Sequence, residues 1–207
     1  MPKLLADAGR GRPRAACAVP VLFGMAAVFA ATSAAAHTGA GGIGGFASGF
    51  QHPIFGYDHL LAMLAVGIWG AQMGGRAVWS LPVTFPLVMA VGGIAGMLGL
   101  YLPAVETGIA LSVLALGLAI AFAWRPFEPV ALLLIAAFAI FHGYAHGAEL
   151  PDAADPAAYS VGFVMATGLI HIGGIGIGLL LGKLFEGWFS RALGAVIAAG
   201  GLYFLWA

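Results

Sequence analysis

Charged residues are scarce in this chain of 207 residues: they make up only 8%, whereas 62% are hydrophobic and the mean hydropathy is +1.02. A soluble domain carries about 25% charged residues, so this composition excludes an ordinary soluble globule. Lys and Arg balance Asp and Glu at eight each, which leaves neither a basic surface for nucleic acid nor an acidic tail. The composition indicates an integral protein of the lipid bilayer that binds no nucleic acid.

Cysteine is nearly absent as well, because Cys17 is the only one. It lies in a segment typical of a secretory signal: four cations within residues 1–14, an apolar stretch over 15–31, and a small-residue cleavage site at 34–36. We predict a signal peptide over residues 1–36 that is cleaved before His37; the alternative is an uncleaved membrane helix. Cleavage leaves a domain over 37–207 without any thiol and places its N-terminus in a bacterial periplasm.

The rest of the chain divides into six apolar segments, each near the roughly 20 residues that cross a bilayer. We therefore predict an all-α membrane protein with six transmembrane helices in one bundle, at about residues 53–73, 78–101, 104–124, 128–149, 158–182 and 188–206. Gly92-x3-Gly96 and Gly174-x3-Gly178 predict close helix contacts. Pro82 and Pro86 predict a kink in the second segment. We infer no internal repeat.

The few charges fall on opposite sides of this arrangement. All four cations that follow the signal lie in loops predicted to be cytoplasmic, namely Arg76, Arg125, Lys183 and Arg191. This agrees with the positive-inside rule and predicts a multi-pass protein of the inner membrane with both termini periplasmic. The outer loops hold acids at Glu106, Glu149, Asp152 and Asp155. An acidic outer face favours a cationic solute, although a solvated surface would carry the same residues.

A first cluster of ionisable residues lies at the start of the first apolar segment, in the sequence His52-Pro53-Ile54-Phe55-Gly56-Tyr57-Asp58-His59. Pro53 is expected to start a helix, and His52 and His59, seven residues apart, would then share one face. Asp58 can ligate a metal beside His59 or orient its ring. Ionisable residues inside a membrane helix usually mark a binding site or a pathway.

A second cluster, Phe141-His142-Gly143-Tyr144-Ala145-His146-Gly147-Ala148-Glu149, ends the fourth apolar segment. In a helix, His142, His146 and Glu149 lie within about 60° of arc, because each residue turns the helix by about 100°. Gly143 and Gly147 would let another helix approach closely. Both clusters lie at the outer leaflet, so we expect them to converge on one centre.

Imidazoles with a few carboxylates suit Ni, Co, Zn, Cu(II) or Fe, whereas Cu(I) would call for Cys or Met and Mg or Ca for oxygen ligands. Six residues form the predicted site for a divalent ion: His52, Asp58, His59, His142, His146 and Glu149. His37 is a further candidate if the new amino terminus chelates with its imidazole. His171 stands alone in the fifth segment, as a packing or gating residue or as a deeper ligand. Hydrogen-bonded helix contacts are the alternative for the histidines of the two clusters. For His37 the alternative is an unligated first residue in a flexible Gly-rich stretch.

The two clusters resemble the motifs of the HupE/UreJ family of nickel and cobalt permeases. His52, Asp58 and His59 match a His-x5-Asp-His motif, and residues 141–149 match Phe-His-Gly-x-Ala-His-Gly-x-Glu without departure. The likeness extends over nearly the whole chain. It implies uptake of Ni²⁺, with Co²⁺ as a related substrate, to supply hydrogenase or urease. No cofactor and no catalytic residue are implied.

Other classes of protein use similar residues. An intramembrane metal hydrolase would need His-Glu-x-x-His, but Gly143 stands where the general base belongs and His146 is one residue too far along. A membrane serine protease would need an activated Ser, and Ser48 has no evident base. A haem-binding electron-transfer subunit would use axial His and show a Soret band. Carboxylates beside the imidazoles favour a divalent cation.

Overall fold

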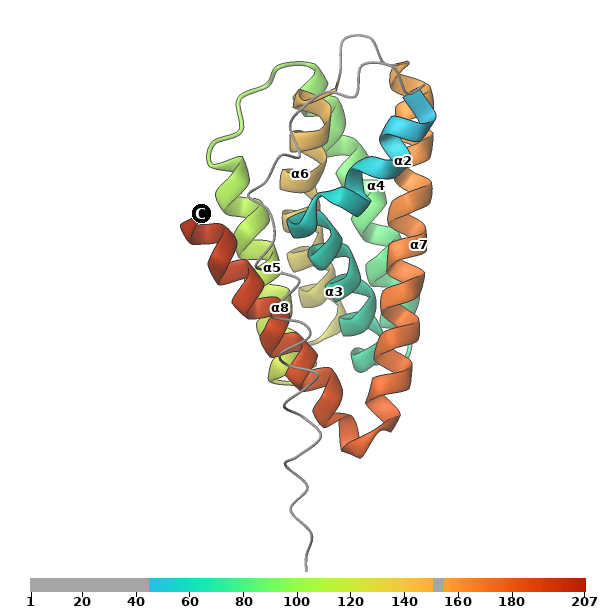
Figure 1. Ribbon diagram of the computed structural model, residues 1–207, viewed down its shortest axis with the longest axis vertical. Helices are drawn as coiled ribbons and strands as arrows, with labels where there is room; N and C mark the ends of the chain where they lie inside the picture. Colours follow the sequence, from blue (N-terminus) through green and yellow to red (C-terminus); the bar gives the residue numbers. More distant parts are fainter. Residues whose placement is uncertain (1–44, 151–154) are drawn as a thin grey trace, which may run out of the picture. The chain divides into compact units, whose positions relative to one another are not determined.

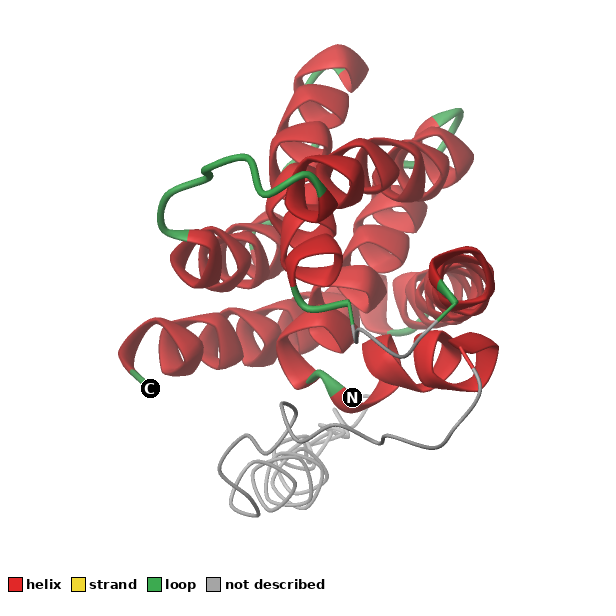
Figure 2. Cartoon of the chain, turned by 90° about the horizontal axis from the view of Figure 1, so that it is seen from above, coloured by secondary structure: helices red, strands yellow, loops and turns green. Residues whose placement is uncertain are grey.

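The computed structural model describes residues 45–150 and 155–207, all within one compact unit over Gly39–Ala207. The predicted signal peptide, His37 and Asp152 lie outside these residues. The described elements are all helical, as predicted (Figure 2). They are α2 (Gly45–Phe55), α3 (Tyr57–Met73), α4 (Ala77–Met97), α5 (Val105–Ala121), α6 (Glu128–Ala148), α7 (Pro156–Lys183), the 3-10 turn η1 (Phe185–Gly187) and α8 (Trp188–Trp206).

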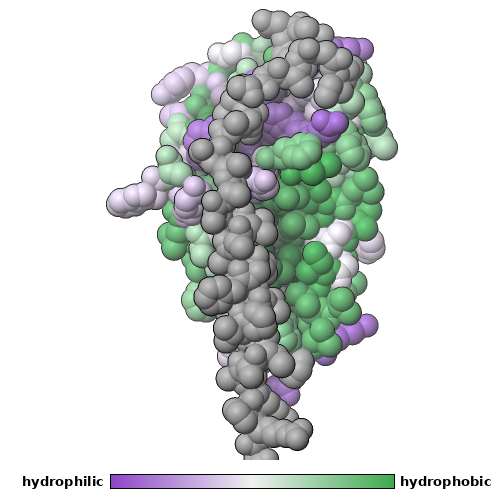
Figure 3. Space-filling view, in the orientation of Figure 1, coloured by the Kyte–Doolittle hydropathy of each residue, from purple (hydrophilic) through white to green (hydrophobic). Residues whose placement is uncertain are grey.

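Four of the described helices, α4, α6, α7 and α8, are each long and apolar enough to cross a membrane. The pair α2 and α3 passes the same test together, and α5 is a shorter apolar helix of 17 residues. Large apolar side chains point outward from these helices, among them Leu87, Leu133, Leu169 and Leu180. In Figure 3 apolar residues cover most of the visible middle, and hydrophilic residues gather toward the two ends. These features are those of a multi-pass membrane protein.

The first predicted segment differs from expectation, because it is not one helix starting at Pro53. Residues Gly45–Phe55 already form α2, with Pro53 inside it, and the chain bends by 77° between α2 and α3. The break falls at Gly56, whose extended backbone (φ −79°, ψ 98°) interrupts the helix. Proline also removes one helical hydrogen bond just before the break. His52 and His59 therefore lie on different helices rather than on one face (Figure 1).

Helix packing depends on small residues, as the Gly-x3-Gly patterns predict. A Cβ at Gly92 or Gly96 of α4 would collide with the backbone of α6, and a Cβ at Gly143 or Gly147 of α6 would collide with the backbone of α4. Gly174 makes a similarly close approach of α7 to α3. The pairs α4–α6, α3–α7 and α5–α8 form the largest contacts. Without a Cβ at these positions, the backbones approach closely enough for dispersion contacts to hold the bundle together.

Polar contacts join the helix ends where the four described cations lie. Arg191 of α8 donates from Nε to the carbonyl of Ala121, the last residue of α5 (2.8 Å). Gln72 of α3 donates to the Ile120 carbonyl (3.0 Å), and Trp69 donates to the Trp124 carbonyl (2.9 Å). Carbonyls at a helix end lack helical donors, so Arg191 supplies one at the end of the short helix α5. Gln72 and Trp69 bind carbonyls of its last turn and of the loop that follows it.

Candidate metal site

Four histidine rings gather where the bend between α2 and α3 meets the end of α6. The ring of His59 lies 4.8 Å from that of His142 and 4.4 Å from that of His146, measured between centroids. His52, on α2, lies 4.7 Å from His146 and 6.4 Å from His59. His59, His142 and His146 are buried. The bend thus brings both histidine clusters to one place, as expected. The first cluster reaches it from two helices, α2 and α3, rather than from a single helix.

Asp58 holds His59 in one orientation. Its Oδ1 accepts a hydrogen bond from the His59 backbone N–H (2.8 Å) and lies 2.8 Å from Nδ1 of the same ring. An ionised carboxylate only accepts, so Nδ1 must carry the proton and Nε2 of the neutral ring carries the lone pair. Nε2 is buried and makes no hydrogen bond to any residue in the described part of the chain. Asp58 therefore stands as the orienting partner of His59, and a bare ring nitrogen faces the site.

Ser112 of α5 holds the ring of His142 in one orientation. The Ser112 hydroxyl donates its single proton to the Ile109 carbonyl (2.6 Å), and its oxygen lies 2.8 Å from Nε2 of His142. Because that proton is committed, Ser112 must accept and Nε2 must donate. The lone pair of His142 then resides on Nδ1, which is buried without a hydrogen bond among residues 45–150 and 155–207. The sequence analysis missed Ser112, although a hydroxyl within an apolar helix needs a partner and was the available signal.

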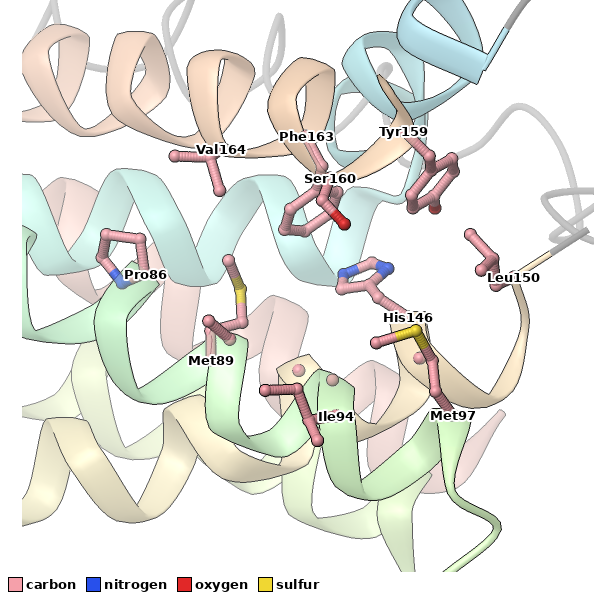
Figure 4. A pocket seen from close by; sticks show the side chains of 14 residues that line it. Pro86, Met89, Ile94, Met97, His146, Leu150, Tyr159, Ser160, Phe163 and Val164 are labelled. Atoms are coloured by element: carbon pink, nitrogen blue, oxygen red, sulfur yellow. The ribbon is translucent and has the colours of Figure 1, made fainter. Parts of the chain in front are cut away.

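Aromatic side chains of α7 pack against the histidine rings. Phe163 lies 4.1 Å from His146 between ring centroids, and Tyr159 lies 6.1 Å from His52. Beside them is a mainly apolar cavity of about 260 Å³ between α4, α6 and α7, lined in part by His146, Met89 and Met97 (Figure 4). Neither methionine lies in a sequence cluster, yet the fold brings both near one histidine.

The four histidines do not form a finished coordination sphere. Among the described residues, no three His, Cys, Asp or Glu side chains are arranged so that they could hold a metal ion. The rings meet edge to face or tilted instead, at 82° for His52 against His146 and 59° for His59 against His146. Metal–nitrogen bonds of about 2.0–2.1 Å need lone pairs directed at one point, as in zinc sites. Rotation of these rings would be required before they could share an ion.

Other residues singled out in the sequence lie outside the group of four histidines. Glu149 is exposed and caps the end of α6, where its backbone N–H donates to the Ala145 carbonyl (2.9 Å). Asp155 caps the start of α7 by accepting from the backbone of Ala157 and Ala158 (2.9 and 3.3 Å). His171 is buried in α7 apart from the four histidines, and it contacts Phe85 of α4 at 5.5 Å between centroids.

Two comparisons with known proteins each match most of the chain. The model of the family described as HupE / UreJ protein matches residues 25–204. A protein named HupE from Rhizobium leguminosarum bv. viciae is 45% identical over 177 residues, which are 85% of this chain and 92% of that protein. No solved structure matches. Because both matches extend far beyond the two histidine motifs, the chain belongs to the HupE/UreJ family.

Proposed function

We propose that this protein is a permease that takes up Ni²⁺, with Co²⁺ as a related substrate, from the periplasm into the cytoplasm. The HupE/UreJ family is linked to nickel and cobalt uptake for hydrogenase and urease. The observation that carries the proposal is the gathering of four histidine rings from α2, α3 and α6, with bare nitrogens on His59 and His142. Imidazole suits borderline divalent ions of this kind.

In this proposal the histidine group captures the ion and replaces part of its water shell. His52, His59, His142 and His146 supply nitrogen ligands once their rings rotate, while Asp58 and Ser112 hold two of the rings. Glu149, exposed at the same end of the bundle, would attract the hydrated cation first. Binding must stay weak enough for release, because a transported ion has to leave each site it occupies.

We further propose six spans with both termini in the periplasm, after removal of residues 1–36. The bent pair α2 and α3 would serve as the first span, and α5, although short, would be the third. Impermeant maleimide labelling tests this topology on a background in which Cys17, the only cysteine, leaves with the signal. Ala207→Cys should react in intact cells, and Gly75→Cys should react only after permeabilisation.

Uptake of radiolabelled Ni²⁺ by cells producing the full chain tests the function. His59→Ala and His146→Ala, at matched expression, should each lower uptake at least about tenfold, since changes even to the partners of metal ligands cost 10–100-fold. Gly173→Ala is the control, because a Cβ there meets nothing within 4 Å. Wild-type uptake in both histidine variants would contradict the proposal. A Soret band in the purified protein would favour a haem protein instead.

A further inference from the structure

A line of side chains on α7 continues inward from the histidine group. Tyr159, Phe163, Thr167 and His171 are spaced four residues apart, so they follow one face of the helix, and all four are buried. The first two contact the rings of His52 and His146. The last two are polar and lie about one and two turns deeper in the helix. The face that encloses the outer histidines therefore carries two further candidate ligands toward the middle of the bundle.

Both deeper side chains have unsatisfied polar atoms. Thr167 is fully buried and His171 is 2% exposed. The Thr167 hydroxyl makes no hydrogen bond within the described residues. Neither ring nitrogen of His171 makes one of good geometry there, and the backbone group that the ring approaches is that of Pro82. A buried polar group without a partner costs about 1–3 kcal/mol, and such groups are rare enough to need a specific explanation. A transient cation with its remaining water would satisfy both.

A backbone carbonyl of α4 lies near the His171 ring. Pro86 has no N–H, so the carbonyl of Pro82, four residues earlier in α4, lacks its helical donor. The Pro82 backbone lies beside the His171 ring. On the opposite side, α3 passes so closely that a Cβ at Gly67 would collide with the His171 carbonyl. One imidazole and one carbonyl thus lie together between α3, α4 and α7, and the Thr167 hydroxyl lies one turn away on α7. These are donor types that a partly hydrated divalent ion accepts.

Phe85 contacts one histidine of each group. Its ring is fully buried and lies 5.4 Å from that of His142 and 5.5 Å from that of His171, between centroids. A benzene ring offers no ligand to a doubly charged ion, and hydrophobic constrictions close ion pathways by excluding water. The two groups of ligands are neighbours, because His142 and His171 each contact the same apolar side chain.

We propose that His171 and Thr167, with the Pro82 carbonyl, form a second, inner station for the transported divalent ion, and that Phe85 is the barrier between the two stations. This inference rests on the proposed function. The inner station has fewer nitrogen ligands than the outer group, so it holds the ion more weakly. A second, weaker site explains how an ion captured by four imidazoles is released toward the cytoplasm.

Two measurements test the inner station: the number of Ni²⁺ ions bound per protein and the rate of Ni²⁺ uptake by cells. Equilibrium dialysis of the purified full chain with Ni²⁺ should give two ions per wild-type protein and one for His171→Gln. In cells, His171→Gln should lower the maximal uptake rate about tenfold or more, with a smaller change in the half-saturating Ni²⁺ concentration. Thr167→Val, which keeps the shape of the side chain, should lower the maximal rate several-fold. Its control is Ser190→Ala, which removes another buried hydroxyl, on α8.

Phe85→Ala tests the barrier, since it should raise downhill Ni²⁺ flux into proteoliposomes several-fold above wild type. One ion per wild-type protein, or wild-type maximal uptake in both His171→Gln and Thr167→Val, would overturn the inner station. Unchanged or lower flux in folded Phe85→Ala, verified by gel filtration, would overturn the barrier. The proposed function fails separately, if the wild-type protein neither binds Ni²⁺ nor takes it up. Uptake that depends on His59 but not on His171 would refute only the inner station.

Discussion

The hydroxyl oxygen of Ser112 on α5 lies 2.8 Å from Nε2 of His142 on α6, and its proton is already donated to the Ile109 carbonyl. The contact joins α5 to the second histidine cluster and fixes which ring nitrogen of His142 holds the lone pair. Metal-ligating histidines commonly depend on such a partner for their orientation. Ser112 is therefore expected to control how well His142 binds an ion.

Ser112→Ala should raise the half-saturating Ni²⁺ concentration for uptake about tenfold, within the range typical for the partner of a metal ligand. The reason is that the His142 ring loses its acceptor and can adopt either tautomer. Ser112→Thr keeps the hydroxyl and should stay near wild type. An equal rise of the half-saturating Ni²⁺ concentration in both variants would show that position 112 matters for packing alone.

Asp58→Ala should lower Ni²⁺ uptake about 10–100-fold, because the His59 ring loses the carboxylate that keeps its proton on Nδ1. Asp58→Asn should retain part of the uptake, since an amide oxygen can still accept from Nδ1. Glu106→Gln is the control for removing an acid in the first turn of a neighbouring helix. If Glu106→Gln lowers uptake as much as Asp58→Ala does, overall surface charge is the cause rather than orientation of the ring.

Gly147→Ala should destabilise the protein by about 1–3 kcal/mol, as expected for overpacking. Its Cβ would collide with the Gly93 backbone of α4, which cannot move as a side-chain end can. Thermal unfolding in detergent should show a lower midpoint than in wild type. Gly173→Ala makes the same chemical change in open space and should leave the midpoint unchanged or higher, because Ala favours helix. Equal midpoints for Gly147→Ala and Gly173→Ala would contradict the close packing of α4 on α6.

Nickel should stabilise the folded protein, because an ion that binds only the folded state at about 100 times its dissociation constant adds about 2.7 kcal/mol. The unfolding midpoint of the wild-type protein should rise when Ni²⁺ is added. It should return to its value without Ni²⁺ when EDTA removes the ion. His142→Ala should lose most of this shift, since the lone pair on Nδ1 of His142 is one of the proposed ligand atoms. A full shift in His142→Ala would exclude that ring from the site.

Much of the fold could be predicted from the sequence because membrane helices leave a strong local signal. Apolar runs and Gly-x3-Gly spacings predicted helices and close contacts that the structure confirms at Gly92 and Gly96. The first segment was predicted wrongly, because Pro53 was expected at a helix start and instead lies inside α2. Local preference allows either position for proline near a helix end, and tertiary contacts decide between them. One such contact is Gly49 of α2 against the backbone of Tyr159 in α7.

The candidate site was predictable in its histidines and not in its surroundings. His142 and His146 belong to a dense motif with helical spacing, which a single chain reveals. Ser112 and Phe85 come from helices distant in the sequence. A lone Ser in an apolar run signals that it needs a partner, but no spacing shows which residue the Ser or the Phe contacts. Their roles arise from proximity in space, which depends on how α4 and α5 pack against α6.

The sequence by itself determined that this is a helical membrane protein with two histidine clusters, because scarce charge and helical spacing are local properties of the chain. Only the tertiary structure decided that His52 and His59 approach each other across a 77° bend, and that Asp58 and Ser112 leave one bare nitrogen on each of two rings. It also decided that Phe85 contacts both His142 and His171. Ring contacts and hydrogen bonds between helices depend on packing distances of a few ångströms, and no spacing along the chain encodes them.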